Sequence, residues 1–335
     1  MHLTAALAAL TLVLAPTPAP TTTAAPGEVL CTVDDPRAIE LSGLVATPDG
    51  YVSVVDSQWD RSTVVIVYLD FECRVTRIQG YPTEPRDPED LAVAPDGALW
   101  VSDTGDNFTA TGRRKTVALW RIPPEGGDPV IHRLTYPDGP HDAEALVFTD
   151  DGTPIIITKE LGSVSYLYEP TRPLEPNTAE GVPMTRVGEF RPIVTGEPND
   201  LGRIGQVLVT GAAISPDRTR VALRTYTTAY EWDVPDGDIV KAITTGTPRI
   251  TQLPDEPQGE SIAYSLDGQW FLTLSDESGP TQLRRYRPTP PERASVLPIS
   301  EVTQGRWVGL AFLFGGSAIL VGSLVGFVVG WLRRR

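Results

Sequence analysis

The chain has 335 residues, of which 43 are acidic and 28 are lysine or arginine, so its formal net charge is −15 at pH 7. A surface of this sign repels nucleic acid and anionic headgroups and attracts cations, which argues against a nucleic-acid-binding protein. The only two cysteines, Cys31 and Cys73, form no C-x-x-C pair, so the sequence gives a redox role no support.

Residues 1–25 predict a signal peptide followed by a Pro/Thr-rich linker. They carry no acidic or basic side chain other than His2, and an apolar stretch from Leu3 to Ala15 precedes small residues. This pattern is typical of secretion signals, and the alternative is a disordered N-terminus. In an exported chain, a single pair of cysteines favours a disulfide over two buried thiols.

A repeated unit fills the region that follows, which we predict to be one domain over residues 27–287. Each copy has acidic residues before an apolar run, a P-D-G-like turn, and a second apolar run that ends in polar residues. The turns are centred on Asp49, Asp96, Asp151, Asp217 and Asp267, at intervals of 47, 55, 66 and 50 residues. Such a period is typical of propeller blades. We therefore expect an all-β fold, a β-propeller of five blades, or of six if the long loop before Gly205 hides an irregular one.

The P-D-G turns themselves have a structural interpretation. Asp and Gly suit a type I turn with a left-handed residue after it, so the five aspartates should lie on the face opposite any site. In the fourth unit we expect strands at 211–215, 220–226, 229–234 and 239–244. The last unit lacks a fourth strand of its own, which would come either from residues 294–300 or from residues 27–33. The second choice would close the ring, and a Cys31–Cys73 disulfide would hold that segment to the first blade.

The C-terminal part predicts a membrane anchor. A Pro-rich stalk over 288–306 precedes residues 307–332, which carry no charge and are long enough to cross a bilayer as a helix. Flanking tryptophans and the arginines at 333–335 place the tail in the cytoplasm and the N-terminal domain outside the cell. We thus expect a single-pass protein of the cell membrane, in contact with lipid. A small-residue stripe, Gly322, Gly326 and Gly330, would permit self-association of this helix.

The candidate site follows from the path of the chain through a blade. Residues just before the first strand and just after the second converge on one rim around the central channel. The candidate metal ligands precede the first strands: Glu40, Asp87, Glu89, Asp142, Glu144 and Glu260. The candidate ligand-binding residues flank the same strands: Asp103, Asp106, Asn107, His141, Lys159, Glu160, Arg224 and Glu277.

Several carboxylates that face one narrow channel cannot all stay ionised without compensation, because like charges raise one another's pKa. A hard cation with oxygen ligands, most plausibly Ca²⁺, would compensate them. The alternatives are carboxylates that cap strands and face solvent, or direct catalysis. No G-x-S-x-G lies outside the membrane segment, and H-E-x-x-H and the phosphate-binding P-loop motif are absent. A catalytic residue is therefore not assigned.

Six short segments follow one another along the chain at comparable positions in the repeat: SDTGDN (102–107), DAEAL (142–146), ITKE (157–160), TGAAISPD (210–217), QGESI (258–262) and SDE (275–277). Through them the chain resembles exported bacterial β-propeller proteins and, more loosely, phytase-like esterase and strictosidine-synthase-like propellers. The resemblance covers most of residues 35–285 and implies the fold and the acidic face. The looser relatives can carry Ca²⁺-dependent hydrolysis in the channel. The fourth unit departs from the acidic pattern, with Leu208 and Thr210 in place of carboxylates, which puts a phytase-type phosphate site in doubt.

Two functions are consistent with these features. The first is a membrane-anchored extracellular binding or scaffold propeller whose acidic channel rim holds Ca²⁺ or a small polar ligand. The second is a cell-surface, metal-dependent hydrolase of esters or phosphoesters.

Overall fold

The structure is a computed structural model that describes residues 25–56, 61–106, 113–196, 199, 201–254 and 256–291. The chain divides into two units, residues 1–289 and 290–335, and the helices and strands of the described residues all lie in the first. The predicted signal peptide, membrane segment, glycine stripe and cytoplasmic tail lie outside the described residues, as does most of the stalk. Within the described ranges, no helix has the length and apolar character needed to cross a membrane.

The described residues are almost entirely β-structure, in three four-stranded sheets and one eight-stranded sheet. The first sheet has the order β2 (Leu41–Thr47), β3 (Gly50–Val55), β4 (Ile66–Leu69), β5 (Val75–Gln79). A later sheet has the order β14 (Val209–Ile214), β15 (Arg220–Thr225), β16 (Thr228–Asp233), β17 (Arg249–Gln252). The last sheet runs β18 (Ala263–Tyr264), β19 (Phe271–Thr273), β20 (Thr281–Tyr286), with β1 (Glu28–Val33) as its outer strand.

The eight-stranded sheet consists of two antiparallel four-stranded runs. One run is β6 (Pro88–Val93), β7 (Leu99–Asp103), β8 (Val117–Ile122) and β9 (Val130–Thr135). The other is β10 (Ala143–Phe148), β11 (Pro154–Thr158), β12 (Ser165–Pro170) and β13 (Val182–Phe190). Strand pairing joins the two runs into one sheet where the outer strands β9 and β13 pair in parallel over two residues.

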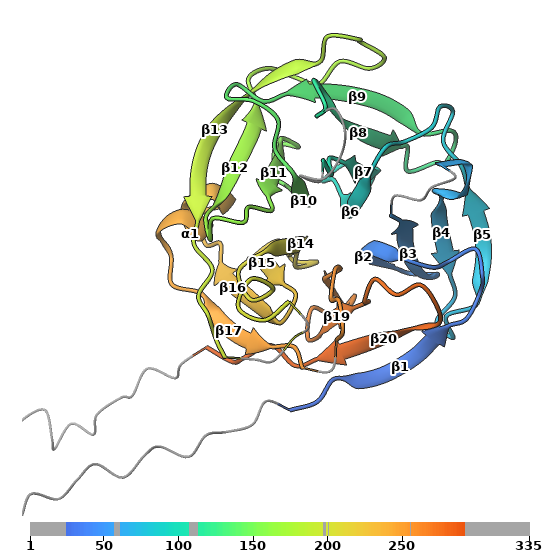
Figure 1. The fold of residues 1–335 in the computed structure, drawn as a ribbon, viewed down its shortest axis with the longest axis vertical. Helices are drawn as coiled ribbons and strands as arrows, with labels where there is room; N and C mark the ends of the chain where they lie inside the picture. The colour runs from blue at the N-terminus through green and yellow to red at the C-terminus, as the bar shows by residue number, and fades with distance from the viewer. Residues whose placement is uncertain are drawn as a thin grey trace, which may run out of the picture. The chain divides into compact units, whose positions relative to one another are not determined.

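The sheets surround a common centre (Figure 1), with the first strand of each run innermost. The inner strands β2, β6, β10, β14 and β18 contact one another in cyclic order, so the ring is closed at its centre as well as at its edge. Apolar side chains fill the spaces between neighbouring sheets; Phe190, Tyr230 and Trp232, for example, pack together in one such cluster. The fold is a β-propeller, as the repeat predicted.

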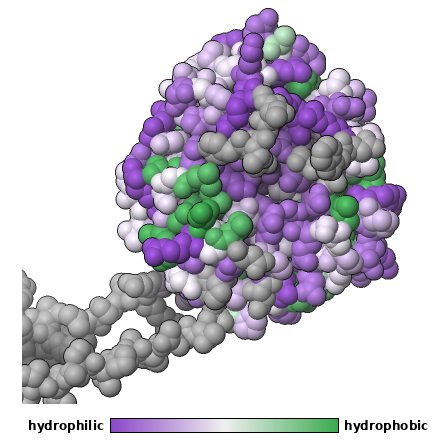
Figure 2. Space-filling view, viewed as in Figure 1, coloured by the Kyte–Doolittle hydropathy of each residue, from purple (hydrophilic) through white to green (hydrophobic). Residues whose placement is uncertain are grey.

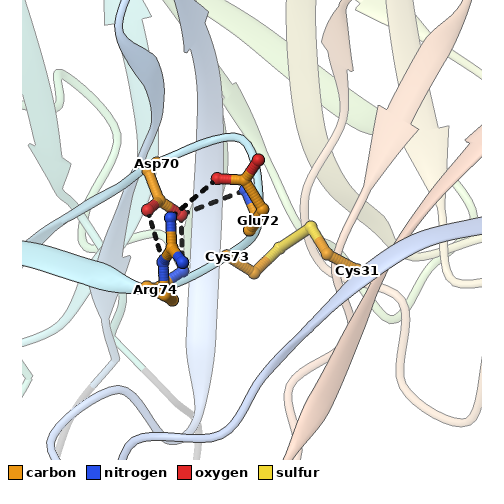
Figure 3. The surroundings of a disulfide bond; sticks show 5 residues. All are labelled: Cys31, Asp70, Glu72, Cys73 and Arg74. Atoms are coloured by element: carbon orange, nitrogen blue, oxygen red, sulfur yellow. Dashed lines mark hydrogen bonds and ion pairs between the residues drawn. A yellow bond between two sulfur atoms is a disulfide. The ribbon is translucent and has the colours of Figure 1, made fainter.

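The N-terminal strand closes the ring. β1 pairs with β20 in antiparallel fashion, which confirms residues 27–33 as the source of the fourth strand of the last sheet. The predicted disulfide is also confirmed: Cys31 in β1 is bonded to Cys73 in the β4–β5 turn, with their Cα atoms 5.7 Å apart (Figure 3). Asp70 orders that turn, since its carboxylate accepts hydrogen bonds from the backbone N–H groups of Glu72 and Arg74 and from the Arg74 side chain. The disulfide therefore fastens the last sheet to the first.

The P-D-G turns have the structural role expected of them. Asp217 accepts hydrogen bonds from the Ser215 hydroxyl (2.5 Å) and the Thr219 N–H (3.1 Å), and Asp267 does the same with Ser265 and Gln269. These bonds hold the pKa of Asp217 down to about 2.

One predicted strand is wrong. Residues 239–244, expected as the outer strand of the fourth unit, belong to the helix α1 (Ile239–Thr245), and β17 takes the outer position instead. The reason is local: the carboxylate of Asp238 caps the helix by accepting from the Lys241 N–H at 2.8 Å. Ile239 and Ile243, four residues apart, are both buried on one face. The segment between β13 and β14, the place for a sixth blade, contains no strand among its described residues.

A buried carboxyl ties the inner strands together below the rim. Asp90 in β6 is fully buried, and its side chain accepts from the backbone N–H groups of Leu146 in β10 (2.8 Å) and Ala212 in β14 (3.2 Å). Burial raises its pKa well above the ordinary value. The residue before it, Glu89, belongs to the candidate site.

Candidate functional site

Residues before the first strand and after the second strand of a sheet meet at the same end, as predicted. The backbone N–H of Asp56 donates to the Glu40 carbonyl at 2.9 Å, and Lys159 N–H donates to the Asp142 carbonyl at 2.9 Å. Gly105 and Asp87 form the equivalent bond in the second unit at 3.1 Å. These repeated bonds bring the acidic residues of successive sheets to one rim around the centre.

A recurring bulge directs two glutamates. The register of β6 against β7 skips Glu89, and that of β10 against β11 skips Glu144. In β14 the skipped residue is Thr210. A bulge releases a residue from the ladder and re-aims its side chain. Glu89 and Glu144 thereby join the aspartates that precede them in the chain.

Two groups of carboxylates result, and they share Glu89. Asp56, Asp87 and Glu89 form one group, and Glu89, Asp142 and Glu144 form the other. Within each group, one oxygen from every carboxylate lies within 4.8 Å of the others. We call these five residues the carboxylate cluster. Gly105 allows the close packing, because a Cβ at that position would collide with the carboxylate oxygens of Glu89 and Asp87.

The cluster holds more negative charge than its surroundings compensate. Burial raises the pKa of Glu89 well above its ordinary value, and the charges of Asp56 and Glu144 raise it further. Burial likewise raises the pKa values of Asp142 and Glu144, although Lys159 opposes this effect in both. At neutral pH the folded cluster therefore favours either bound protons or a bound cation.

One cation of the protein lies against the cluster. The Lys159 ammonium donates to Glu144 Oε1 at 2.5 Å and to the Tyr226 hydroxyl at 2.7 Å. Burial alone would lower the pKa of Lys159, but the charges of Glu144 and Glu260 outweigh it and raise that pKa well above its usual value. Lys159 thus satisfies one oxygen of Glu144. The other oxygen, Oε2, has no hydrogen-bond partner among the described residues, and it is shielded from solvent because Glu144 is only 3% exposed.

These residues fit a hard metal ion. All five side chains offer carboxylate oxygens, which Ca²⁺ and Mg²⁺ prefer and which soft metals do not. Neither group includes a histidine or a cysteine. The donor set therefore favours Ca²⁺ or Mg²⁺ over zinc or copper.

Two of the predicted metal ligands lie on the rim outside these groups. Glu40 has a left-handed backbone (φ 50°), and its N–H donates to the Glu277 carbonyl. Glu260 is 5% exposed and accepts from Gln258 Nε2 at 3.3 Å.

Asp103 and Asp106, predicted to bind a ligand, are engaged by the protein. Asp103 forms a buried ion pair with Arg114 at 2.8 Å and also accepts from Trp120 Nε1 at 3.1 Å. Asp106 pairs with Arg113 at 2.8 Å, while its N–H donates to Asp142 Oδ1 at 2.9 Å. Asp106 thus orients a member of the cluster. Asn107, predicted with them, lies outside the described residues.

The remaining predicted ligand-binding residues separate into three places. His141 Nδ1 is 2.6 Å from Glu160 Oε1, and its Nε2 is 3.1 Å from Asp138 Oδ1. Burial lowers the pKa of His141, but these two carboxylates outweigh it and raise that pKa above its ordinary value. Arg224 is fully buried in an ion pair with Glu256 at 2.8 Å, so its guanidinium lies in the protein interior. Glu277 lines a cavity together with Glu40.

Asp56 and Asp276 follow second strands and are expected on the same rim, but the predicted ligand sets do not include them. Tyr226 is not predicted at all. Asp56 occupies the position after the second strand that Gly105 and Lys159 occupy in later sheets, so the repeat alignment carried the signal. Tyr226 follows β15 in the fourth unit, where Leu208 and Thr210 take the place of the carboxylates before the first strand, so the acidic pattern did not point to this part of the rim.

No family model and no curated protein sequence matches the chain. Among solved structures, it is similar to Myxococcus xanthus glutaminyl cyclase (12% identity, TM-score 0.46, covering 79% of this chain and 97% of that one). It is also similar to the β-propeller domain of Myceliophteria thermophila Cps50 (Swd1) (12%, TM-score 0.40, 77% and 99%). A third similar structure is the gluconolactonase XC5397 of Xanthomonas campestris (14%, TM-score 0.40, 73% and 72%). At these identities, the role of a residue in those proteins cannot be transferred to this chain. The chain is a β-propeller whose ring is closed by a disulfide-linked strand and whose central rim carries a buried carboxylate cluster.

Proposed function

We propose that this protein is a cation-binding propeller whose carboxylate cluster holds Ca²⁺. Each run of the eight-stranded sheet has four consecutive strands, as a blade does, so we count the two runs as two blades and the ring as five-bladed. The observation that carries the proposal is the pair of carboxylate groups joined through Glu89, with Glu144 Oε2 buried and unsatisfied beside them. A divalent ion would satisfy that oxygen and remove the repulsion that raises the pKa of Glu89.

The size of the repulsion supports a bound ion. Two ionised carboxylates at 4.8 Å repel each other by roughly 3.5 kcal/mol at an effective dielectric constant of 20. Such energies are large compared with the whole stability of a typical domain, roughly 5–15 kcal/mol. Ca²⁺ suits the cluster better than Mg²⁺, because it accepts six to eight oxygen ligands in flexible geometry.

The cellular setting belongs to the same proposal. The chain is exported and anchored by residues 307–332, with the propeller outside the cell and the three arginines inside. The disulfide supports an oxidising compartment. Anchors of neighbouring copies would associate through the stripe of Gly322, Gly326 and Gly330. The propeller then acts as a binding or scaffold module at the cell surface.

Calorimetric titration of the full-length chain with CaCl₂ tests the metal proposal. Binding should be strongly reduced in Asp87→Asn and Asp142→Asn, which remove one ligand from each group. Glu125→Gln, which removes an exposed carboxylate by a comparable substitution, should leave it unchanged. Equal Ca²⁺ binding in all four proteins would contradict the proposal.

A second function, metal-dependent hydrolysis, is favoured by a cavity of about 300 Å³ next to the cluster. Arg113, Lys115, His141 and Asp106 line it, and Asp106 contacts Asp142 of the cluster. An anionic ester could there lie between basic side chains and a metal that polarises it. Release of 4-nitrophenol from its phosphate or acetate ester, dependent on Ca²⁺ and lost in Glu89→Gln, would support hydrolysis. Ca²⁺ binding without turnover would support the binding module.

A further inference from the structure

A pocket lined by cations lies among β7, β8, β9 and the segment that precedes β6. Its volume is about 330 Å³, within the range of small-molecule pockets, and no described residue of its lining belongs to the carboxylate cluster. The charged residues of the lining are Glu84, Arg86, Asp103, Arg114, Lys115 and Arg133. Hydrophilic side chains cover most of the face seen in Figure 2, and acidic residues outnumber lysines and arginines in the chain by 43 to 28. Four cations around one pocket therefore run against the overall charge of the protein.

The buried carboxylate of this pocket, Asp103, is stabilised by donors of the protein. Its oxygens accept from the backbone N–H groups of Arg86 at 3.2 Å and Asp87 at 3.0 Å. They also accept from Trp120 Nε1 at 3.1 Å, and the Arg114 guanidinium pairs with Asp103 at 2.8 Å. Because these donors compensate its charge, Asp103 adds little repulsion toward an anion in the pocket.

Arg114 has a donor left after this pairing. Its Nε donates to the Thr116 carbonyl at 3.3 Å and its Nη1 to the Gly105 carbonyl at 2.9 Å, whereas its Nη2 makes no hydrogen bond to the described residues. Arg114 is only 6% exposed, yet Nη2 is not one of the fully buried unpaired polar atoms of those residues, so solvent or a ligand reaches it. An unpaired donor in so buried a side chain is costly, and a ligand oxygen would satisfy it.

The three other cations of the pocket lack carboxylate partners. Arg86 and Lys115 are exposed and Arg133 is half-buried, and none of them forms an ion pair within the part of the chain that the structure describes. The one hydrogen bond that the Arg133 side chain makes there goes to the Thr178 carbonyl at 3.3 Å. Most described arginines do pair with carboxylates, Arg249 for example with two of them. The unpaired cations are therefore available to a ligand.

These charges favour a compact anion that carries two charges. Glu84 is also unpaired among the described residues, so three unpaired cations face one unpaired carboxylate. The excess positive charge attracts a dianion, and planar guanidinium groups match phosphate oxygens bidentately. The apolar side chains of Ala118, Trp120 and Ile131 also line the pocket and leave a place for an organic group.

We propose that this pocket binds a small organic phosphate monoester in its dianionic form. Arg86, Lys115 and Arg133 balance the two charges of the phosphate group. The Nη2 of Arg114 donates to a phosphate oxygen, and the apolar side chains contact the organic group. Neutral alcohols lack the charge, and sulfate monoesters carry only one. The inference does not depend on a metal in the carboxylate cluster.

Calorimetry of the full-length chain at pH 8 tests the proposal with phenyl phosphate, phenyl sulfate and phenol as probes. A chelating resin removes divalent ions beforehand, so that no metal can bind the phosphate. At this pH a phosphate monoester carries close to two negative charges, because its second pKa is about 6, whereas the sulfate carries one. Phenyl phosphate should bind, phenyl sulfate should bind about tenfold more weakly, and phenol should give no heat of binding. Equal binding of the phosphate and the sulfate, or no heat with phenyl phosphate, would overturn the inference.

Two arginines locate the phosphate, because they line this pocket and not the neighbouring cavity of about 300 Å³, which contains Arg113. Arg86→Gln and Arg133→Gln should each weaken phenyl phosphate binding about tenfold, since each removes a charge-assisted hydrogen bond. Arg172→Gln, which changes an exposed arginine outside the pocket, should leave binding unchanged. Circular dichroism melting verifies that each variant is folded. Full binding in both pocket variants would overturn the inference, and a loss in Arg113→Gln instead would place the ester in the neighbouring cavity.

A crystal structure with 4-iodophenyl phosphate keeps the test independent of the variants. The anomalous signal of iodine should lie in the pocket beside Ala118 and Ile131, with the phosphate within hydrogen-bond distance of Arg86 or Arg133. Iodine elsewhere on the propeller would overturn the inference. If CaCl₂ gives no heat while phenyl phosphate binds as expected, the metal proposal fails and this one stands.

Discussion

Replacing Glu89 by Gln should change stability in opposite ways with and without a cation. Glu89 belongs to both carboxylate groups, and ligand atoms of its neighbours lie within 4.8 Å. In EDTA at pH 8, the folded state must either keep Glu89 ionised, against at least one repulsion of roughly 3.5 kcal/mol, or protonate a carboxyl that is ionised in the unfolded chain. The substitution removes this cost in both cases. If about 3 kcal/mol of this appears in the free energy of unfolding, Tm rises by roughly 6–12 °C for a domain of this size. The apo variant should therefore melt well above the apo wild type.

With Ca²⁺ the same substitution should remove most of the ligand's effect. At a concentration of one hundred times Kd, Ca²⁺ stabilises the wild type by about 2.7 kcal/mol. If loss of the shared ligand weakens binding a hundredfold, that concentration stabilises the variant by only about 0.4 kcal/mol. Differential scanning calorimetry of the full-length chain in EDTA and in CaCl₂ measures both effects.

Glu125→Gln is the matched control, since it changes an exposed glutamate and should alter neither value. A lower Tm of Glu89→Gln in EDTA would show instead that the Glu89 carboxyl stabilises the protein without a cation. A full Ca²⁺ response in the variant would refute its role as the shared ligand.

Three further predictions concern other parts of the molecule. Burial and the charges of Glu260 and Glu40 raise the pKa of Asp276 from 3.8 to about 7. The folded state thus holds its proton more tightly, so the free energy of unfolding should fall between about pH 4 and 7 by roughly 4 kcal/mol from this residue, then level off. Urea titrations across pH should show a flatter profile for Asp276→Asn, and an unchanged slope would contradict the assignment. Replacing both Cys31 and Cys73 by Ala should lower the urea-derived free energy of unfolding by about 4 kcal/mol, since the disulfide spans 42 residues. A loss below 1 kcal/mol would show that ring closure does not need it. Asp238→Ala should cost about 1 kcal/mol by uncapping α1, measured the same way, whereas Asp236→Ala, outside the cap, should cost little.

The repeat predicted the propeller because the sequence of each unit contains the pattern of two inner strands joined by a turn. The turns at Asp96 and Asp151 mark where the chain reverses direction, and the apolar residues on either side of each turn indicate the two strands. The outer strands carry weaker signals. Residues 239–244 are rich in β-branched side chains, which favour a strand, yet the Asp238 cap and the spacing of Ile239 and Ile243 make them a helix.

The acidic rim was predictable for the same reason. Which of its residues form the carboxylate cluster, and which pair with other side chains, was not predictable. Asp87 and Asp142 occupy one repeat position, and Glu89 and Glu144 another, so their approach follows from symmetry. The bulges that re-aim Glu89 and Glu144 depend on register, which the sequence does not state. Nor did the sequence show that Arg224 pairs with Glu256 in the protein interior, because Glu256 is not part of the repeat pattern. Long-range pairing of this kind requires the folded chain.

Ca²⁺ binding by the carboxylate cluster can be seen directly in a crystal structure of the protein grown with Ca²⁺ and recorded at a wavelength where calcium scatters anomalously. We expect an anomalous peak among the carboxylates of Asp56, Asp87, Glu89, Asp142 and Glu144, at about 2.3–2.6 Å from their oxygens. An empty cluster at a Ca²⁺ concentration that saturates the protein in solution, or a peak elsewhere on the propeller, would contradict it.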